Sequence, residues 1–381
     1  MKNITKILFS LFLSLSVIQS ANAGEMSVTG SAQATYVITS SDSATSQVEK
    51  KPGIGLSNEL AFNADGEFGN GYTWNYQVEL DSDQRNGAAI NDDTRLELGT
   101  PYGTIGIYNS EGDLNTHLAS AVSAYNPGYD IGTTGGYEGG TGINSYSNLQ
   151  YHLPSDLLPF GITAKAAYST GQGYGGDAND PGATKIEPTP INSYQITGSP
   201  VEGGTLGASY LEKTNTAVST TTPKYETGGL FGKYNIGSFS FGAGRHWVNP
   251  NVGDAAGTCA TTTAVKSSST SVSSTTGLPV KTTSYCAGTR FFENDALSVA
   301  FQVNPELSVS VDKMTSTANV TNTTGAGVKT ETNRDLEVQS VQAAYNIGGA
   351  VVAIGQKTVD GVNYAEGVNV KETVFSLKMA F

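Results

Sequence analysis

The sequence predicts an all-β chain, a closed barrel of 16 antiparallel strands that spans a membrane. Three observations lead to this fold. Apolar and polar residues alternate at period two in segment after segment, which indicates strands with one apolar face. Short turns and long polar stretches alternate in joining these segments, so the long loops gather at one end of the sheet. The chain also stops inside an alternating segment, "VFSLKMAF", rather than in a polar tail.

Residues 1–23 have the features of a signal peptide. Lys2 and Lys6 precede an apolar run of about 12 residues, and "ANA" ends a small-residue cleavage pattern at Ala23. An uncleaved membrane anchor is the alternative, but the run is shorter than the roughly 20 residues that a spanning helix needs. We therefore expect export into the periplasm and one mature domain, residues 24–381, that forms the barrel.

The mature domain is acidic. Removing the two signal-peptide lysines leaves 21 − 2 = 19 basic residues against 34 acidic ones, a balance of −15. This charge repels nucleic acid, so no nucleic-acid partner is expected. Disorder is the rival explanation for a chain with 46 Gly and only 14% charged residues. A disordered chain has no reason to keep the alternation, so strands are favoured.

The strands can be followed from the N-terminus. In "GEMSVTGSAQATYV" the polar residues take one face, and the outward face contains the small residues Gly30, Ala32 and Ala34. "GYTWNYQVELD" places aromatic and aliphatic residues on one face and polar residues on the other, and "DALSVAFQV" and "LSVSVD" repeat the pattern. A water-soluble sandwich would alternate too, but it would bury the apolar faces against a second sheet.

The connections favour a closed barrel. Seven short turns and eight long loops link 16 strands. Strands of about 9 to 11 residues can cross a bilayer, and closure leaves no unpaired edge in the hydrocarbon. The last strand must then pair with the first and turn its apolar face to lipid. The residues of that face are Phe375, Leu377, Met379 and Phe381.

These features resemble the general porins of Gram-negative outer membranes, over the whole mature chain. The ending is similar to the family's terminal assembly signal, which is apolar at alternate positions and ends in Phe. "RLELGTPYGTIGIYN" is similar to the strand, turn and strand that lead into the third loop, and "NSYSNLQYHLP" to the strand that follows it. The resemblance implies a homotrimer in the cell outer membrane, delivered by the barrel-assembly machinery. It also implies that the third loop, here 110–144, folds into the pore as a constriction.

The resemblance further assigns residues to the pore. Four acids of the third loop match the family's acidic side by position: Glu111, Asp113, Asp130 and Glu138. Four charged residues of the strands face inward by parity: Arg95, Lys165, Glu59 and Glu79. Since acids outnumber bases, the basic wall is expected to be weaker than in the family and the pore to prefer cations.

The expected function follows from barrel size. About 16 strands leave a water-filled channel, whereas about eight fill their own interior, so we expect passive diffusion of small hydrophilic solutes and ions. A substrate-specific channel and a non-conducting structural or adhesive barrel stay open as alternatives. An enzyme is not expected, because His117, His152 and His246 are scattered and no nucleophile elbow is present. A barrel-embedded lipase is the enzymatic alternative, since its Ser and His would be neighbours only in space.

The remaining expectations concern cross-links, metals and oligomer contacts. Cys259 and Cys286 lie 27 positions apart in one Ser/Thr-rich loop of an exported chain, so we expect a disulfide within the loop, with two free thiols as the alternative. No cofactor is expected. Asp177 and Asp180 are calcium candidates, although their spacing matches no defined site and solvated loop acids are commoner. The small outward residues of the first strand predict that it lies in a trimer interface, where a neighbouring barrel can approach closely.

Overall fold

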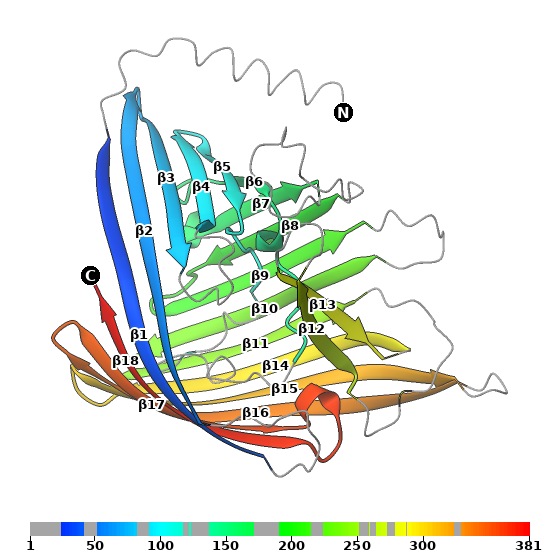
Figure 1. The fold of residues 1–381 in the computed structure, drawn as a ribbon. Helices are drawn as coiled ribbons and strands as arrows, with labels where there is room; N and C mark the ends of the chain where they lie inside the picture. Colours follow the sequence, from blue (N-terminus) through cyan, green and yellow to red (C-terminus); the bar gives the residue numbers. More distant parts are fainter. Residues whose placement is uncertain are drawn as a thin grey trace.

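The computed structural model describes residues 24–41, 52–81, 91–116, 122, 137–170, 190–214, 224–250, 259, 264–272, 279–286, 288–323 and 329–381. Within these residues, 16 strands form one closed antiparallel ring in the order β1-β18-β17-β16-β15-β14-β11-β10-β9-β8-β7-β6-β5-β4-β3-β2 (Figure 1). The predicted fold class is thereby confirmed. Strands β12 and β13 form a separate two-stranded sheet.

The strands have the following bounds: β1 (Glu25–Ser41), β2 (Gly53–Gly69), β3 (Tyr72–Asp81), β4 (Asn91–Thr100), β5 (Gly103–Asn109), β6 (Asn148–His152), β7 (Thr163–Ser169), β8 (Ile191–Gly198), β9 (Gly204–Lys213), β10 (Tyr225–Ile236), β11 (Phe239–Asn249), β12 (Lys266–Val272), β13 (Pro279–Tyr285), β14 (Thr289–Gln302), β15 (Leu307–Thr323), β16 (Lys329–Ile347), β17 (Ala350–Asp360) and β18 (Asn369–Ala380). Three short 3-10 helices lie in the described part of the chain: η3 (Ile143–Ser145), η4 (Pro159–Gly161) and η5 (Val362–Tyr364). None of the described helices is long and apolar enough to cross a bilayer.

The ring closes between β1 and β18, its first and last strands in the sequence. β1 and β18 pair from Ser31 opposite Ala380 to Ser41 opposite Val370. The pairing continues into the last residue, because the amides and carbonyls of Gly30 and Phe381 exchange hydrogen bonds of 2.8 and 2.9 Å. Phe375, Leu377 and Phe381 are exposed on the outer face. The alternation at the C-terminus therefore exists because the last strand completes the barrel wall.

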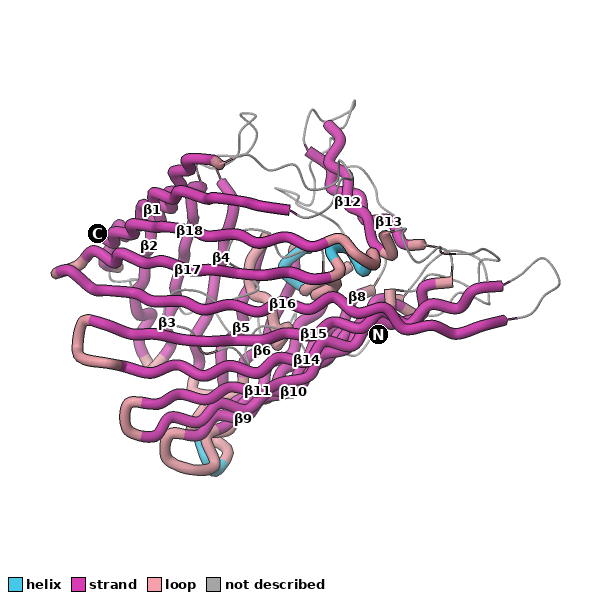
Figure 2. The backbone as a smooth tube through the Cα atoms, turned by 90° about the horizontal axis from the view of Figure 1, so that it is seen from below, coloured by secondary structure: helices cyan, strands magenta, loops and turns pink. Residues whose placement is uncertain are grey.

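Short turns gather at one end of the barrel, as Figure 2 shows. They lie at 70–71, 101–102, 153–162, 199–203, 237–238, 303–306 and 348–349, the seven places where the sequence predicts short connections. Two of the two-residue turns have positive φ at both residues, Asn70 (56°) with Gly71 (79°) and Gly348 (55°) with Gly349 (102°). Such turns follow the twist of paired strands, which explains the glycines. We call this end the turn end and the opposite one the loop end.

The sequence gives no indication of the β12–β13 hairpin, which lies at the loop end. The segment was expected only as a long Ser/Thr-rich loop, yet Lys266 to Val272 pair with Tyr285 to Pro279. A disulfide joins Cys259 to Cys286 with their Cα atoms 5.7 Å apart. Thr favours strands whereas Ser favours turns, so a composition rich in both does not distinguish a strand from a loop.

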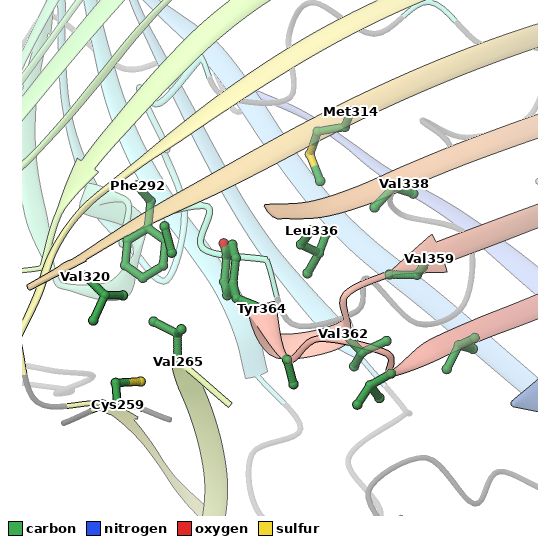
Figure 3. Close-up of a cluster of buried hydrophobic side chains, with 14 of the residues drawn as sticks. Cys259, Val265, Phe292, Met314, Val320, Leu336, Val338, Val359, Val362 and Tyr364 are labelled. Carbon is green, nitrogen blue, oxygen red and sulfur yellow. The ribbon is translucent and has the colours of Figure 1, made fainter. Parts of the chain in front are cut away.

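An apolar cluster fills part of the barrel interior beneath this hairpin (Figure 3). Strands β14 to β18 contribute the inward residues Phe292, Val320, Leu336, Val338, Val359 and Val370, all at most 2% exposed. Val265 and Cys259 cover them from the hairpin side, and Tyr364 of η5 lies against Phe292 with ring centroids 5.2 Å apart. The inner face of this sector is therefore apolar, which the sequence analysis did not anticipate. Apolar residues are stable there because loops exclude water from them.

The candidate pore and its constriction loop

The third loop leaves the barrel wall through a charged cluster. Arg95 on β4 points inward and forms an ion pair with Glu111, the second residue of the loop. The Nε atom of Arg95 also lies 3.9 Å from Glu97, which accepts a hydrogen bond from the Tyr108 hydroxyl. The charge of Glu111 is therefore largely neutralised by Arg95, and Glu111 has little effect on the rest of the pore.

The loop then follows the inner wall of the barrel. The Leu114 carbonyl accepts a 3.1 Å hydrogen bond from Gln195 on β8, and the Thr116 amide donates to Ser209 on β9 at 3.0 Å. Further along, the Val122 amide donates to Ser298 on β14 at 2.8 Å. These contacts with three strands place the described part of the loop inside the ring, as the resemblance implies.

The return arm is anchored through Glu138, which is only 5% exposed. Its carboxylate lies 3.1 Å from the Lys266 ammonium of β12 and accepts a 2.7 Å hydrogen bond from the Tyr285 hydroxyl of β13. Its backbone amide donates to the Tyr364 hydroxyl, and its carbonyl accepts from Asn294, both at 2.8 Å. Burial, and then the Glu138 charge, raise the pKa of Tyr285 well above its usual range, so the phenol stays a donor. Glu138 therefore joins the third loop to the hairpin, to η5 and to β14.

The acids predicted for the constriction occupy different environments. Asp113 is exposed and accepts the Asn115 amide at 2.9 Å, whereas Glu111 is paired and Glu138 is buried. Among the loop acids that the structure describes, Asp113 is best placed to act on passing ions. Asp130 lies outside the described residues, as do His117 and both calcium candidates, Asp177 and Asp180.

The predicted wall residues point into the barrel. Glu59 on β2 and Glu79 on β3 share the inward face of adjacent strands, where Glu79 lies opposite Ala61. Lys165 on β7 lies between His152 and Gln195 in the strand ladder. No cluster of three or more potential metal-ligating side chains occurs among the described residues.

Sequence reasoning missed inward bases of the later strands, among them Lys233, Arg334, Lys357 and Lys378. Lys357 is fully buried in the ladder between Ser340 and Glu372. Parity could have identified these residues, because each alternates with outward apolar or exposed neighbours. Sequence reasoning also missed the inward acids Asp312 on β15 and Glu372 on β18, so the charge of the inner face is more mixed than the sequence suggests.

The three small residues of β1 differ in what surrounds them. A Cβ atom added to Gly30 would lie 2.7 Å from a ring atom of Phe381 and 2.8 Å from the Glu59 carbonyl oxygen. Gly30 is therefore small because the C-terminal ring packs over it. Ala32 and Ala34 face outward opposite Met379 and Leu377 of β18.

Solved outer-membrane proteins share this architecture. OmpF of Salmonella typhi in complex with daunomycin is 12% identical, with 95% of this chain and 100% of that chain covered and a TM-score of 0.60. An anion-selective porin from Comamonas acidovorans is 11% identical, with 94% and 100% covered and a TM-score of 0.59. OmpT of Vibrio cholerae in a trimer form is 13% identical, with 94% and 100% covered and a TM-score of 0.56.

No protein-family model and no curated protein sequence matches the chain. The structural likeness, at identities of 11 to 13%, therefore concerns the fold. It covers the barrel over nearly its whole length, and the resemblance seen in the sequence is confirmed at that level. The chain is a 16-stranded β-barrel with the general porin fold.

Proposed function

We propose that this protein is a water-filled channel of the outer membrane, through which small hydrophilic solutes and ions diffuse passively. The observation that carries the proposal is the third loop, which is held against the inner wall of a closed 16-stranded ring. A ring of this size leaves an aqueous lumen, and a loop fixed inside it narrows that lumen. No catalytic step and no cofactor are part of the proposal.

The proposed assembly is a homotrimer in lipid, reached through the periplasm after removal of residues 1–23. The solved OmpT structure in a trimer form supports this assembly. The exposed apolar residues at the end of β18, such as Met379 and Phe381, support a lipid-facing wall and recognition by the barrel-assembly machinery. The outward alanines of β1, Ala32 and Ala34, are proposed as one face of the subunit contact.

We further propose a modest preference for cations. Exposed Asp113 and the inward acids Glu59 and Glu79 favour cations, because a narrow passage lined by one sign of charge concentrates counter-ions. The additional inward bases, Lys378 among them, oppose this effect and keep the preference small. The preference is thus expected to depend on a few acids near the constriction.

Liposome swelling tests solute diffusion directly. Vesicles that contain the purified protein should swell in isotonic solutions of uncharged sugars, at rates that fall smoothly as the sugar becomes larger. Swelling with a single sugar class would favour the substrate-specific channel. Absence of swelling with every sugar would favour the non-conducting barrel and contradict the proposal.

A further inference from the structure

A small pocket of about 210 Å³ lies between the return arm of the third loop and the ends of strands β8 to β10. Thr141 and Tyr146 line it from the return arm, and Ile191, Lys213 and Tyr225 from the strands, where Lys213 pairs with both of the other two. Lys213 has the inward parity of Ser209 on β9, which bonds to the third loop. The cavity, which we call the Lys213 pocket, is therefore inside the barrel at its loop end.

The pocket contains a cation that the chain does not neutralise. The Lys213 ammonium donates a 3.0 Å hydrogen bond to the Tyr146 hydroxyl and lies 5.2 Å from the centre of the same ring. The adjacent acid, Glu212, pairs instead with Lys224 at 3.3 Å. Within the described part of the chain, no carboxylate lies within 4 Å of the Lys213 ammonium. An ammonium has three donors and Tyr146 takes one, so this group suits an anionic ligand.

Two phenol groups add donors to the same pocket. The Tyr225 hydroxyl accepts a hydrogen bond from the Thr141 amide, and the Tyr146 hydroxyl accepts one from Lys213. A phenol that accepts in this way still has its own proton to donate. An ionised carboxylate only accepts hydrogen bonds and has two oxygens to do so, which matches an ammonium flanked by two hydroxyl donors.

The remaining wall is apolar. Tyr146 and Tyr225 pack against a cluster that includes Ile191 and Leu211, which are 0% and 4% exposed. An inorganic anion would leave these walls without contacts, and a sugar would leave the ammonium without a counter-charge. A cation would be repelled by Lys213. Mostly apolar walls with a few converging polar groups are typical of small-molecule sites, and here they suit an anion with an apolar body.

The volume of the pocket limits the size of that body. A cavity of about 150 Å³ is large enough for benzene, and one water takes about 30 Å³ of liquid. Once a single ring is placed in the Lys213 pocket, about 60 Å³ is left, the room of about two waters. This space fits one planar carboxylate attached to the ring.

We infer that the Lys213 pocket binds a small organic acid, a carboxylate attached to a single ring. The carboxylate lies at the Lys213 ammonium and the hydroxyls of Tyr146 and Tyr225, and the ring lies against the apolar wall. A role in uptake, in which the pocket collects such acids at the mouth of a lumen that otherwise favours cations, rests on the proposed function. Binding itself requires only the folded barrel.

Benzoate is the probe, and ligand-observed saturation-transfer NMR on the folded protein in detergent micelles measures its binding. Two further probes separate the parts of the ligand: benzyl alcohol has the ring without the charge, and acetate has the charge without the ring. Micelles without protein give the background for each probe. We expect saturable binding of benzoate, about tenfold tighter than that of either other probe, the loss expected for a missing hydrogen bond to a charged group.

Lys213→Met removes the ammonium and keeps an unbranched side chain. We expect it to weaken benzoate binding about tenfold and to leave the binding of benzyl alcohol unchanged. Lys224→Met is the matched control, because it removes a charge at the same end of the barrel from a residue that does not line the pocket. Gel mobility of the folded barrel is checked for each variant, and the comparison of the three probes on the unmodified protein stands even if Lys213→Met does not fold.

The inference is overturned if benzoate does not bind saturably, if benzyl alcohol or acetate binds as tightly, or if folded Lys213→Met binds benzoate as tightly as the unmodified protein. Sugar swelling is measured on vesicles made from the same preparation. Benzoate binding without swelling would contradict the channel and leave the pocket in place, whereas swelling without benzoate binding would contradict the pocket alone.

Discussion

The carboxylate of Glu138 lies 3.1 Å from the ammonium nitrogen of Lys266, and this contact joins the return arm of the third loop to the disulfide-bonded hairpin. Both side chains are largely buried, with 6% and 15% of their surface exposed. The third loop, which is the proposed constriction, is therefore held by the β12–β13 hairpin, and a disulfide fixes that hairpin in turn. The width of the pore should depend on a hairpin that does not line it.

Replacing Lys266 should loosen this anchor. Lys266→Met leaves the Glu138 carboxylate buried without its cation, and breaking such a pair costs about 3 to 5 kcal/mol. We expect noisier single-channel currents, because the loop is held less firmly. Lys224→Met is the matched control, since Lys224 pairs with Glu212 near the surface with 54% of its side chain exposed, where a pair contributes about 0 to 1 kcal/mol. Equal noise in both variants would contradict the anchoring role.

Reduction of the disulfide should loosen the β12–β13 hairpin and leave the barrel wall intact. Closing a loop of this length stabilises the folded form by roughly 3 to 4 kcal/mol in the chain-entropy model. Without the bond, protease should cleave more readily between residues 248 and 289. The barrel strands should stay intact, because their ladder does not include Cys259 or Cys286. If reduction alone abolishes the gel mobility of the folded barrel, the disulfide stabilises the barrel strands as well as the loop, and the prediction is wrong.

Enlarging Gly30 should impair closure of the barrel. Any Cβ at this position meets the Phe381 ring and a backbone carbonyl, and overpacking of this kind costs about 1 to 3 kcal/mol. We expect Gly30→Val to lower the temperature at which the barrel unfolds on a heat-modifiability gel. Ala34→Val, also outward on β1 but facing Leu377, should have little effect. If the two variants unfold at the same temperature, packing of the Phe381 ring over Gly30 does not contribute to the stability of the barrel.

The alanine face of β1 can be tested through the oligomer. Ala32→Trp should weaken the trimer while sparing the barrel, because the larger ring prevents close approach of a neighbouring copy. The readouts are cross-linked oligomer size and, for the barrel itself, heat-modifiable mobility. If the trimer of the variant is as stable to heat as the wild-type trimer, β1 does not lie in the subunit interface.

Ion selectivity should respond to the exposed loop acid. Asp113→Asn removes a negative charge from the lumen and should shift the zero-current potential in a KCl gradient towards anions. The shift should shrink as salt is raised, because the screening length is about 8 Å at physiological ionic strength. Glu111→Gln should shift it in the same direction by freeing the Arg95 charge. Glu226→Gln is the control, since Glu226 faces outward and accepts the Tyr210 hydroxyl. An equal shift in all three variants would mean that the third loop does not set selectivity.

The sequence predicts the barrel because every spanning strand needs the same alternation. The pairing of residues as far apart in the sequence as Ser31 and Ala380 could be predicted, because the ring must close. The inner face is less predictable. Phe292 and Leu336 have lumen parity but are covered by loops, and no periodic pattern reveals which loop covers which sector.

The candidate site was predictable in outline only. Position in the third loop identifies Glu111, Asp113 and Glu138, but tertiary partners decide their roles. Arg95 neutralises Glu111, the β12–β13 hairpin buries Glu138, and Asp113 stays exposed. The inward bases Lys233 and Lys357 could have been found by extending the parity of the early strands to β10 and β17.

Planar-bilayer recording tests the central claim most directly, because it measures whether the purified protein forms an open aqueous path. The account predicts large stepwise currents that are linear in voltage and do not saturate as KCl concentration rises. Each insertion event should consist of three equal steps if the channel is a homotrimer. A protein that inserts as folded barrels, as judged by its gel mobility, yet gives no current at any voltage would contradict the account.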